Sequence, residues 1–217
     1  LTARLDINLS AGHMRLGQID QALAAGLRAL AVYDQDPLAD PSRHHRLLGN
    51  LALIYKATNQ RSEARDAFTR ALELVRRTSG PEHPGVATML NNLGELALDE
   101  GKLDEARKYA DEAAAIRRRA LPPEHLAFAD GEQLFGGIAE GRKDTSAALA
   151  HYRRALELHT SSPRPSQVKV ASIHNDLANL AAGESRFDDA IADYRHALAG
   201  FTEVGGPDNA YSLMVEA

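Results

Sequence analysis

A repeat of 42 residues runs through the whole chain. Residues at the same place in successive repeats share a small or apolar character. Two series of alanines have this interval. The first is Ala22, Ala64, Ala106, Ala148 and Ala190, and the second is Ala29, Ala71, Ala113, Ala155 and Ala197. Two further series are Leu9, Leu51, Leu93, Phe135 and Leu177, and Gly12, Ile54, Leu96, Ile138 and Leu180. A fixed period is typical of a repeat protein, in which each unit buries its apolar face by stacking on its neighbours.

Five such units account for nearly all of the 217 residues. We therefore predict a single solenoid domain over residues 1–217. Its repeats are expected at about 1–42, 43–84, 85–126, 127–168 and 169–210. Residues 211–217 would start a sixth helix or form a cap.

Each repeat is predicted to form two antiparallel helices. Apolar residues recur at steps of three and four, as in Leu47, Leu51 and Ile54, which places them on one helix face. No period of two persists, so no strand is expected. Gly17 and Gly101 fall between the two helices of a repeat, and prolines separate the repeats. The sequence predicts an all-α fold with helix pairs at about 3–16 with 19–33, 44–58 with 61–77, 85–100 with 103–119, 126–142 with 145–160, and 168–184 with 187–203.

The composition excludes several classes of protein. The net charge is -5, from 25 Lys and Arg against 30 Asp and Glu, whereas a nucleic-acid-binding surface is usually basic. No apolar stretch reaches the roughly 20 residues that cross a bilayer, and without Cys there is no disulfide or thiolate metal site. We therefore expect a cytoplasmic protein that binds neither nucleic acid nor membrane. Since the chain opens with Leu1 and no leader, we interpret it as a fragment of a longer protein.

No pattern in the sequence predicts catalysis, a cofactor or a metal ion. Gly136–Gly141 has the spacing of a phosphate-binding loop, but Arg142 follows it and the glycines lie in an expected helix. The nine histidines contain no His-Glu-x-x-His motif, and His83 and His125 mark one shared loop position. Carboxylates such as Asp188–Asp189 lie at helix starts, where negative charge is favourable. We expect a protein that is not an enzyme.

The repeat resembles the tetratricopeptide repeat. The family's first-helix pair of Leu with Gly or Ala appears as Leu51-Ala52, Leu93-Gly94 and Leu177-Ala178, and its second-helix aromatic residue as Phe68, Tyr152 and Tyr194. The period, the Asn91–Gly94 string and the Gly80–Pro84 loop are similar to the kinesin-light-chain type of repeat, which is abundant in bacterial signalling proteins. The fourth repeat departs from the pattern, because Gly131 takes a core place and Leu134 takes the Asn place.

The resemblance implies a right-handed superhelix whose first helices line a concave groove. It favours a non-catalytic scaffold that binds an extended peptide or a protein partner in this groove. Two alternatives stay open: a regulatory or sensor domain of a larger bacterial serine/threonine kinase or transcriptional regulator, and a module that self-associates through its open repeat ends. The carboxylate-clamp subtype needs lysines where Ile7 and Gly49 stand, so we reject it.

The candidate partner-binding residues occupy the wall of the expected groove. A polar ladder runs through Asn8, Asn50 and Asn92, is interrupted by Leu134 and resumes as Asp176. An amide both donates and accepts, so the ladder either bridges to the backbone of a bound peptide or satisfies itself across the seam between repeats.

Charge is sorted along the same wall. The basic residues Arg4, Arg15, Arg46 and Lys56 come first, and the acidic residues Glu95, Asp99, Asp130, Glu140 and Asp176 follow. Such an order either orients a charged ligand or is an ordinary solvated face. Asn91, Asn175 and Asn179 complete the set of candidates.

Overall fold

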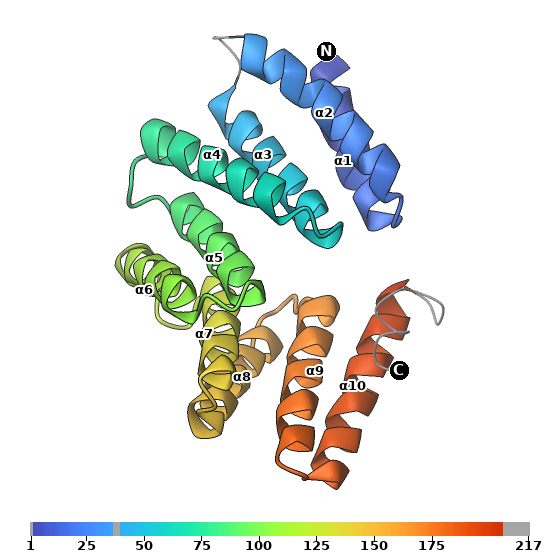
Figure 1. The fold of residues 1–217 in the computed structure, drawn as a ribbon, viewed down its shortest axis with the longest axis vertical. Helices are drawn as coiled ribbons and strands as arrows, with labels where there is room; N and C mark the ends of the chain where they lie inside the picture. The colour runs from blue at the N-terminus through green and yellow to red at the C-terminus, as the bar shows by residue number, and fades with distance from the viewer. Residues whose placement is uncertain (1, 37–39, 206–217) are drawn as a thin grey trace. The chain divides into compact units, whose positions relative to one another are not determined.

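The computed structural model describes residues 2–36 and 40–205 of the chain (Figure 1). Within these ranges the fold is an all-α repeat solenoid of ten α-helices and one short 3-10 helix, without a strand. The helices are α1 (Thr2–Arg15), α2 (Ile19–Gln35), α3 (Pro41–Ala57), α4 (Arg61–Ser79), α5 (Pro84–Asp99), α6 (Leu103–Ala120), η1 (Leu126–Phe128), α7 (Ala129–Gly141), α8 (Thr145–Thr160), α9 (Gln167–Gly183) and α10 (Phe187–Gly205). The predicted helix pairs are confirmed, except that the first helix of the fourth pair is divided. None of the described helices is long and apolar enough to cross a membrane.

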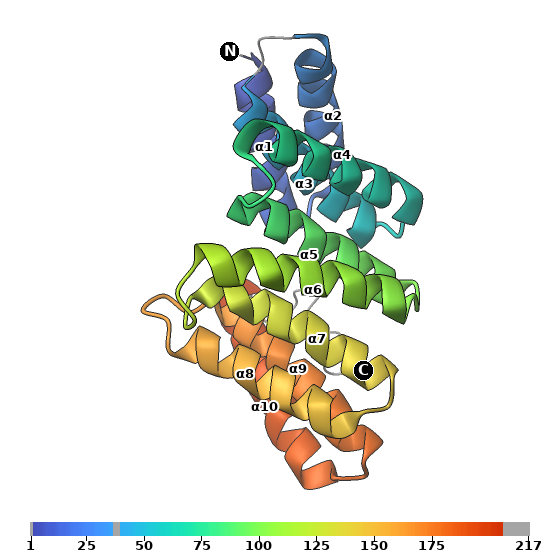
Figure 2. The ribbon, with the colours of Figure 1, turned by 90° about the vertical axis from the view of Figure 1, so that its left-hand side faces the viewer.

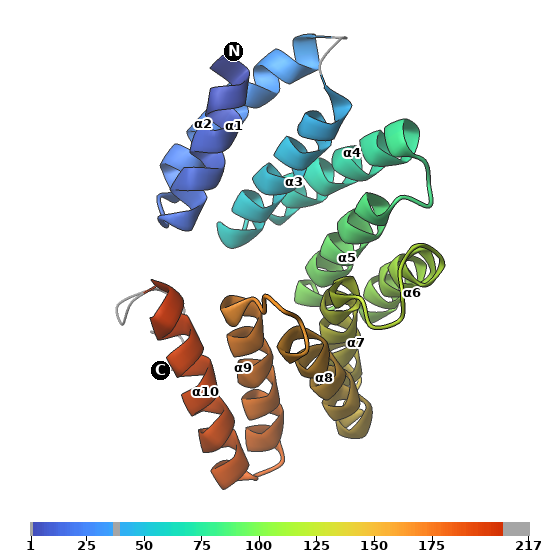
Figure 3. The ribbon, with the colours of Figure 1, turned by 180° about the vertical axis from the view of Figure 1, so that it is seen from behind.

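Two compact units make up the chain. The first comprises Leu1–Glu100 with Asp111–Ala120, and the second comprises Gly101–Ala110 with Leu121–Ala217. In the first unit α1 packs against α2 and α3 against α4, and α2 contacts α3 as α4 contacts α5 (Figure 2). In the second unit α7 packs against α8 and α9 against α10, and α8 contacts α9 (Figure 3). The single domain, its repeat boundaries and its right-handed course stay predictions, and the expected cap at 211–217 lies outside the described residues.

The turn between the two helices closes in the same way in the first, second, fourth and fifth repeats. The backbone amides of Gln18, Gln60, Asp144 and Arg186 each donate to the carbonyl five residues earlier, at 2.8–2.9 Å. This is the Schellman closure of a helix end, and it needs a residue in the left-handed conformation. Gly17 has a φ of 70°, as glycine readily allows, but Lys143 and Ser185 adopt the same conformation with a φ of 61°. The turn therefore survives the loss of glycine in the last two repeats.

The two alanine series form the contact surfaces of the repeats. All ten of these alanines are buried. A methyl side chain lets neighbouring helices approach closely, so this position leaves little room for anything larger. The sequence prediction of an alanine-lined core is confirmed.

The first repeat departs from the predicted core. Leu5 and Leu9 are 60% and 40% exposed, although Leu47 and Leu51 at the same places of the next repeat are fully buried. Leu47 and Leu51 pack against Ala29 and other residues of α2, the second helix of the preceding repeat. Among the described residues no helix stands in that place before α1. Leu9 belongs to the same apolar series as the buried Leu51, and Leu5 stands one turn before it, so the periodicity favours a burial that the first repeat does not have.

The fourth repeat accommodates its unusual residues by a local rearrangement. The predicted helix over 126–142 is split into the single turn η1 and the helix α7. Gly131 and Leu134 are both buried, and the ring of Tyr152 from α8 lies against Gly136. An aromatic ring here replaces the volume that a larger side chain on the first helix would fill.

Candidate functional site: an arginine-lined pocket between α1 and α3

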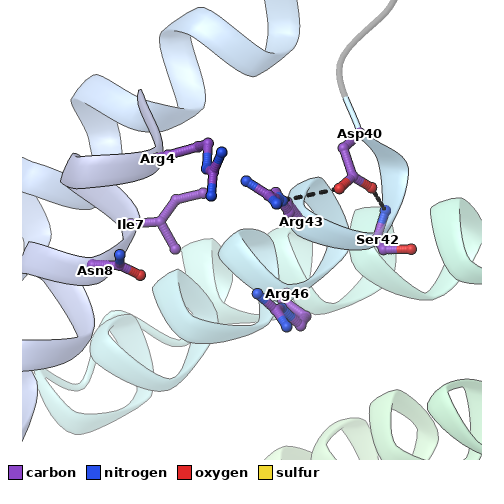
Figure 4. A pocket seen from close by; sticks show the side chains of 7 residues that line it. All are labelled: Arg4, Ile7, Asn8, Asp40, Ser42, Arg43 and Arg46. Atoms are coloured by element: carbon purple, nitrogen blue, oxygen red, sulfur yellow. Dashed lines mark hydrogen bonds and ion pairs between the residues drawn. The ribbon is translucent and has the colours of Figure 1, made fainter. Parts of the chain in front are cut away.

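A pocket of about 320 Å³ lies between α1 and the start of α3 (Figure 4). Helix α1 supplies Arg4, Ile7 and Asn8, which share a face because they are spaced by three and four residues. Helix α3 and its cap supply the other lining residues, Asp40, Ser42, Arg43 and Arg46. We call these seven residues the arginine pocket.

The start of α3 fixes one side of the arginine pocket. The Asp40 side chain accepts a hydrogen bond from the backbone amide of Ser42 at 2.9 Å, and Pro41 follows as the first helical residue. This is a favourable helix start, because the carboxylate satisfies a free amide and the proline has no amide to satisfy. Asp40 also forms an ion pair with Arg43 at 2.9 Å, so its charge is shared between the helix start and that guanidinium.

The pocket has a surplus of positive charge. It contains three arginines and one carboxylate. Figure 4 shows Arg4 and Arg43 extending toward each other from the two helices, with Arg43 beside Asp40. Within the described residues, no hydrogen bond or ion pair holds the side chain of Arg4 or Arg46, and both are exposed. Two guanidinium groups are therefore available to an anionic ligand, which they can bind in a bidentate way.

Next to the pocket lies His45, whose Nδ1 is 3.1 Å from the carbonyl oxygen of Pro41. Burial lowers the pKa of His45, and the charge of Arg46 acts in the same direction. This histidine is therefore predominantly neutral near neutral pH, and the positive charge of the pocket comes from its arginines.

Only some of the predicted site residues meet in this pocket. Arg4, Asn8 and Arg46 line it together. Arg15 ends α1, and its side chain lies outside the described part of the chain. Asn50 and Asn92 lie half-buried on α3 and α5, so the two alternatives for the asparagine ladder stay open there.

Lys56 does not contribute free positive charge. Its ammonium group contacts Glu95 at 3.2 Å and Asp99 at 3.1 Å. Burial acts to lower the pKa of Lys56, but the two carboxylates outweigh it and raise this pKa. Three residues that the sequence assigned to opposite ends of a charge gradient therefore neutralise one another.

Asn91 also belongs to the protein interior. It is 2% exposed, donates to Glu95 and accepts a hydrogen bond from the buried guanidinium of Arg117 at 3.2 Å. The structure corrects its assignment to the groove wall, because it is not accessible to a partner.

The candidates of the second unit are tied to neighbouring side chains. Asp176 accepts a hydrogen bond from Gln133 at 2.6 Å, and Asn179 accepts one from the Tyr194 hydroxyl at 2.6 Å. Asn175 is half-buried on α9. The hydrogen bond between Asp176 and Gln133 joins two repeats. At this position of the polar ladder it favours packing between repeats over contact with a ligand.

The remaining acidic candidates are also engaged. Asp130 forms an ion pair with Lys169 at 2.8 Å, and the hydroxyl of Tyr152 donates to Glu140 at 2.8 Å. Burial is the main reason that the pKa of Tyr152 is raised, so this hydroxyl stays protonated and remains the donor. These carboxylates stabilise the repeats.

Sequence reasoning missed Arg43, Asp40 and Ser42. It placed the start of this helix at about residue 44, whereas α3 begins at Pro41. The earlier start adds nearly one turn and brings Arg43 onto the same face as Arg46. The signal was Asp40-Pro41, which is a favourable helix start and not only a break between repeats.

The family follows from comparison with known proteins. A family model described as tetratricopeptide repeat matches residues 43–119 and 86–161, together more than half of the chain. The chain is a tetratricopeptide-repeat protein. Repeats of this family mediate protein–protein interaction, and the fold is typically non-catalytic.

Solved structures agree with this membership at the level of the fold. The tetratricopeptide-repeat chain is similar to BtubC (BKLC) from P. vanneervenii, with a TM-score of 0.67 and 20% identity over 91% of this chain and 79% of that one. It is also similar to a candidate kinesin light chain from Podosopora anserina with nearly identical TPR-like repeats, with a TM-score of 0.63 and 16% identity over 94% and 97% of the two chains. A single-substitution form of that protein gives a TM-score of 0.65. A search of curated proteins gives no match. The likeness to kinesin-light-chain repeats is shown at the level of the fold.

Proposed function

We propose that this protein is a non-catalytic interaction module that binds an acidic, extended segment of a protein partner. The observation that carries the proposal is the pair Arg4 and Arg46, two exposed guanidinium groups in one pocket without an ionic partner among the described residues. Because the whole chain has a net charge of -5, a local positive pocket attracts an acidic segment against a generally repulsive background.

The pocket offers two kinds of contact to such a segment. The guanidinium groups bind side-chain carboxylates, and the amide of Asn8 on the same wall can pair with the backbone of an extended chain. The apolar side chain of Ile7 lies between Arg4 and Asn8 in sequence and lines the same pocket. An acidic residue beside a small apolar one therefore suits this site.

The test is the affinity for a labelled peptide of alternating Glu and Ala, measured by fluorescence anisotropy at two salt concentrations. Arg4→Glu with Arg46→Glu should weaken binding by at least about tenfold, or ~1.4 kcal/mol, and flatten its salt dependence. Arg77→Glu with Arg153→Glu, two exposed arginines elsewhere on the chain, makes the same change in net charge and serves as the control. Equal losses in both pairs of variants would mean that only net charge matters and that the pocket is not the site.

A second candidate function is self-association through the exposed face of α1. Leu5 and Leu9 occupy the places at which Leu47 and Leu51 pack against the second helix of another repeat. In a second copy, α10 offers such a helix, since it exposes Phe187 and Ile191. Light scattering over a concentration series tests this contact. A native mass that rises with concentration and stays monomeric in Leu5→Ser with Leu9→Ser would support it, and a constant mass for the native chain would exclude it.

A further inference from the structure

Three side chains with metal-ligating atoms meet between α9 and α10. They are His174 of α9 and Asp193 and His196 of α10, and one ligand atom from each lies within 4.8 Å of the others. Asp193 and His196 are three residues apart, so they share a face of α10, and that helix packs against α9. The rings of His174 and His196 stack with their centroids 4.9 Å apart and their planes 22° from parallel.

The hydrogen bonds of both histidines define which ring nitrogen is free. Nδ1 of His174 lies 2.7 Å from a carboxylate oxygen of Asp193, and Nδ1 of His196 lies 2.9 Å from the carbonyl oxygen of Ala192. Both oxygens can only accept, so in the neutral rings each Nδ1 carries the proton. Each Nε2 then has a free lone pair, which is the form in which histidine binds a metal ion.

The same place in other repeats holds a different set of residues. In the fourth repeat the equivalent residues are Glu132, His151 and Arg154, and His151 pairs with Glu132 at 2.7 Å. In the first repeat Asp6 pairs with Arg28 at 2.8 Å. An arginine supplies fixed positive charge in both of these repeats. The fifth repeat has His196 where the first and fourth repeats have Arg28 and Arg154. A neutral histidine offers a nitrogen lone pair there in place of the positive charge of an arginine.

We propose that His174 and His196 bind a divalent transition-metal ion of the zinc class through Nε2, with Asp193 orienting His174. A carboxylate that accepts from the second ring nitrogen is the usual partner of a metal-binding histidine. Ligands of tetrahedral zinc lie roughly 3.4 Å apart, so the Nε2 atoms of the two histidines must come to about that separation when the ion binds. His196 is exposed and can make this movement. Water would complete the coordination sphere.

The experiment is a calorimetric titration of the full chain with zinc chloride after removal of metal by a chelator. We expect one zinc ion per chain. His196→Arg installs the residue of the fourth repeat and should lower the affinity at least tenfold, as should His174→Ala. Asp193→Asn should lower it about tenfold, because the ligands remain while their orientation is lost.

His151→Ala is the matched control, since His151 also contacts a carboxylate and an aromatic ring but lacks a second histidine. It should bind zinc as the native chain does. In 15N NMR of the native chain, zinc should shift Nε2 of His174 and His196, which a purely structural role would not produce. The absence of zinc binding, unchanged affinity in His196→Arg, or equal losses in His151→Ala would each overturn the proposal. Circular dichroism shows whether each variant is folded.

Discussion

The ring of Tyr152 lies so close to Gly136 that a Cβ added to this glycine would stand 2.5 Å from a ring carbon. Tyr152 is itself buried and holds Glu140 through its hydroxyl. The glycine that resembles part of a phosphate-binding loop in the sequence is therefore explained by the packing of two helices.

We predict that Gly136→Ala destabilises the protein by about 1–3 kcal/mol, because the new methyl group must displace the Tyr152 ring. Gly12→Ala is the control, since nothing lies within 4 Å of a Cβ at that position of α1. The control should be stabilised by about 0.5–1 kcal/mol through helix propensity. Urea unfolding of the two variants checks this, and a neutral Gly136→Ala would contradict the close contact.

The buried alanines should resist enlargement. Ala106 and Ala148 have no exposed surface, so Ala106→Leu or Ala148→Leu should each cost about 1–3 kcal/mol and lower the melting temperature. Ala150→Leu on the exposed side of α8 is the matched control and should leave the melting temperature nearly unchanged. Equal melting temperatures for Ala148→Leu and Ala150→Leu would contradict the helix register.

Two adjacent asparagines of α5 should behave differently. Asn91→Ala removes an acceptor from the buried guanidinium of Arg117 and should cost about 1–3 kcal/mol. Asn92→Ala should cost less than about 0.5 kcal/mol, because Asn92 is half-buried and part of the candidate ladder. Chemical unfolding measures both values. If the Asn92 variant proved the less stable of the two, the ladder would serve chiefly to hold the repeats together.

Stability should fall at acid pH through His159. This residue is 4% exposed, and within the described structure neither of its ring nitrogens has a hydrogen-bond partner. Burial lowers the pKa of His159, while Asp130 acts to raise it and Lys169 to lower it. The unfolded chain therefore binds this proton at a higher pH than the folded chain does. The contribution of His159 to stability is fully present above the unfolded pKa of about 6.5 and is lost as pH falls below it.

The measurement is the free energy of unfolding at pH 7.5 and pH 5.5 for the native chain and for His159→Leu. Leucine cannot take up a proton and leaves no unpaired nitrogen, so the variant should lose less stability between the two pH values. An identical pH dependence in the two proteins would show that His159 is not a source of it.

The repeat pattern predicted those parts of the fold that depend on one helix packing against the next. The alanine series and the helix pairs follow from a register that recurs every 42 residues. The same periodicity misplaced Leu5 and Leu9, because a repeat pattern assigns every unit a preceding neighbour. Burial of Leu5 and Leu9 requires a neighbouring helix that packs against this face of α1. The sequence of α1 does not show whether such a helix is present.

The candidate site was predictable in part, because Arg4, Asn8 and Arg46 share wall positions of the repeat. The pairing of Lys56 with Glu95 and Asp99 was not predictable. These ion pairs depend on how far the long side chains extend from one helix to another. The spacing of residues in the sequence does not predict this distance. The approach of His174 to Asp193 and His196 likewise depends on the relative rotation of α9 and α10.

Asp6 with Arg28, Glu132 with His151, and His174 with Asp193 and His196 occupy the same place in different repeats. This place lies between the two helices of one repeat, apart from the alanines that join repeats. The side chains between the two helices of one repeat can therefore be substituted separately from those that pack one repeat on the next. A charge pair or the histidine cluster of the fifth repeat could be introduced into another repeat without changing the alanines between repeats.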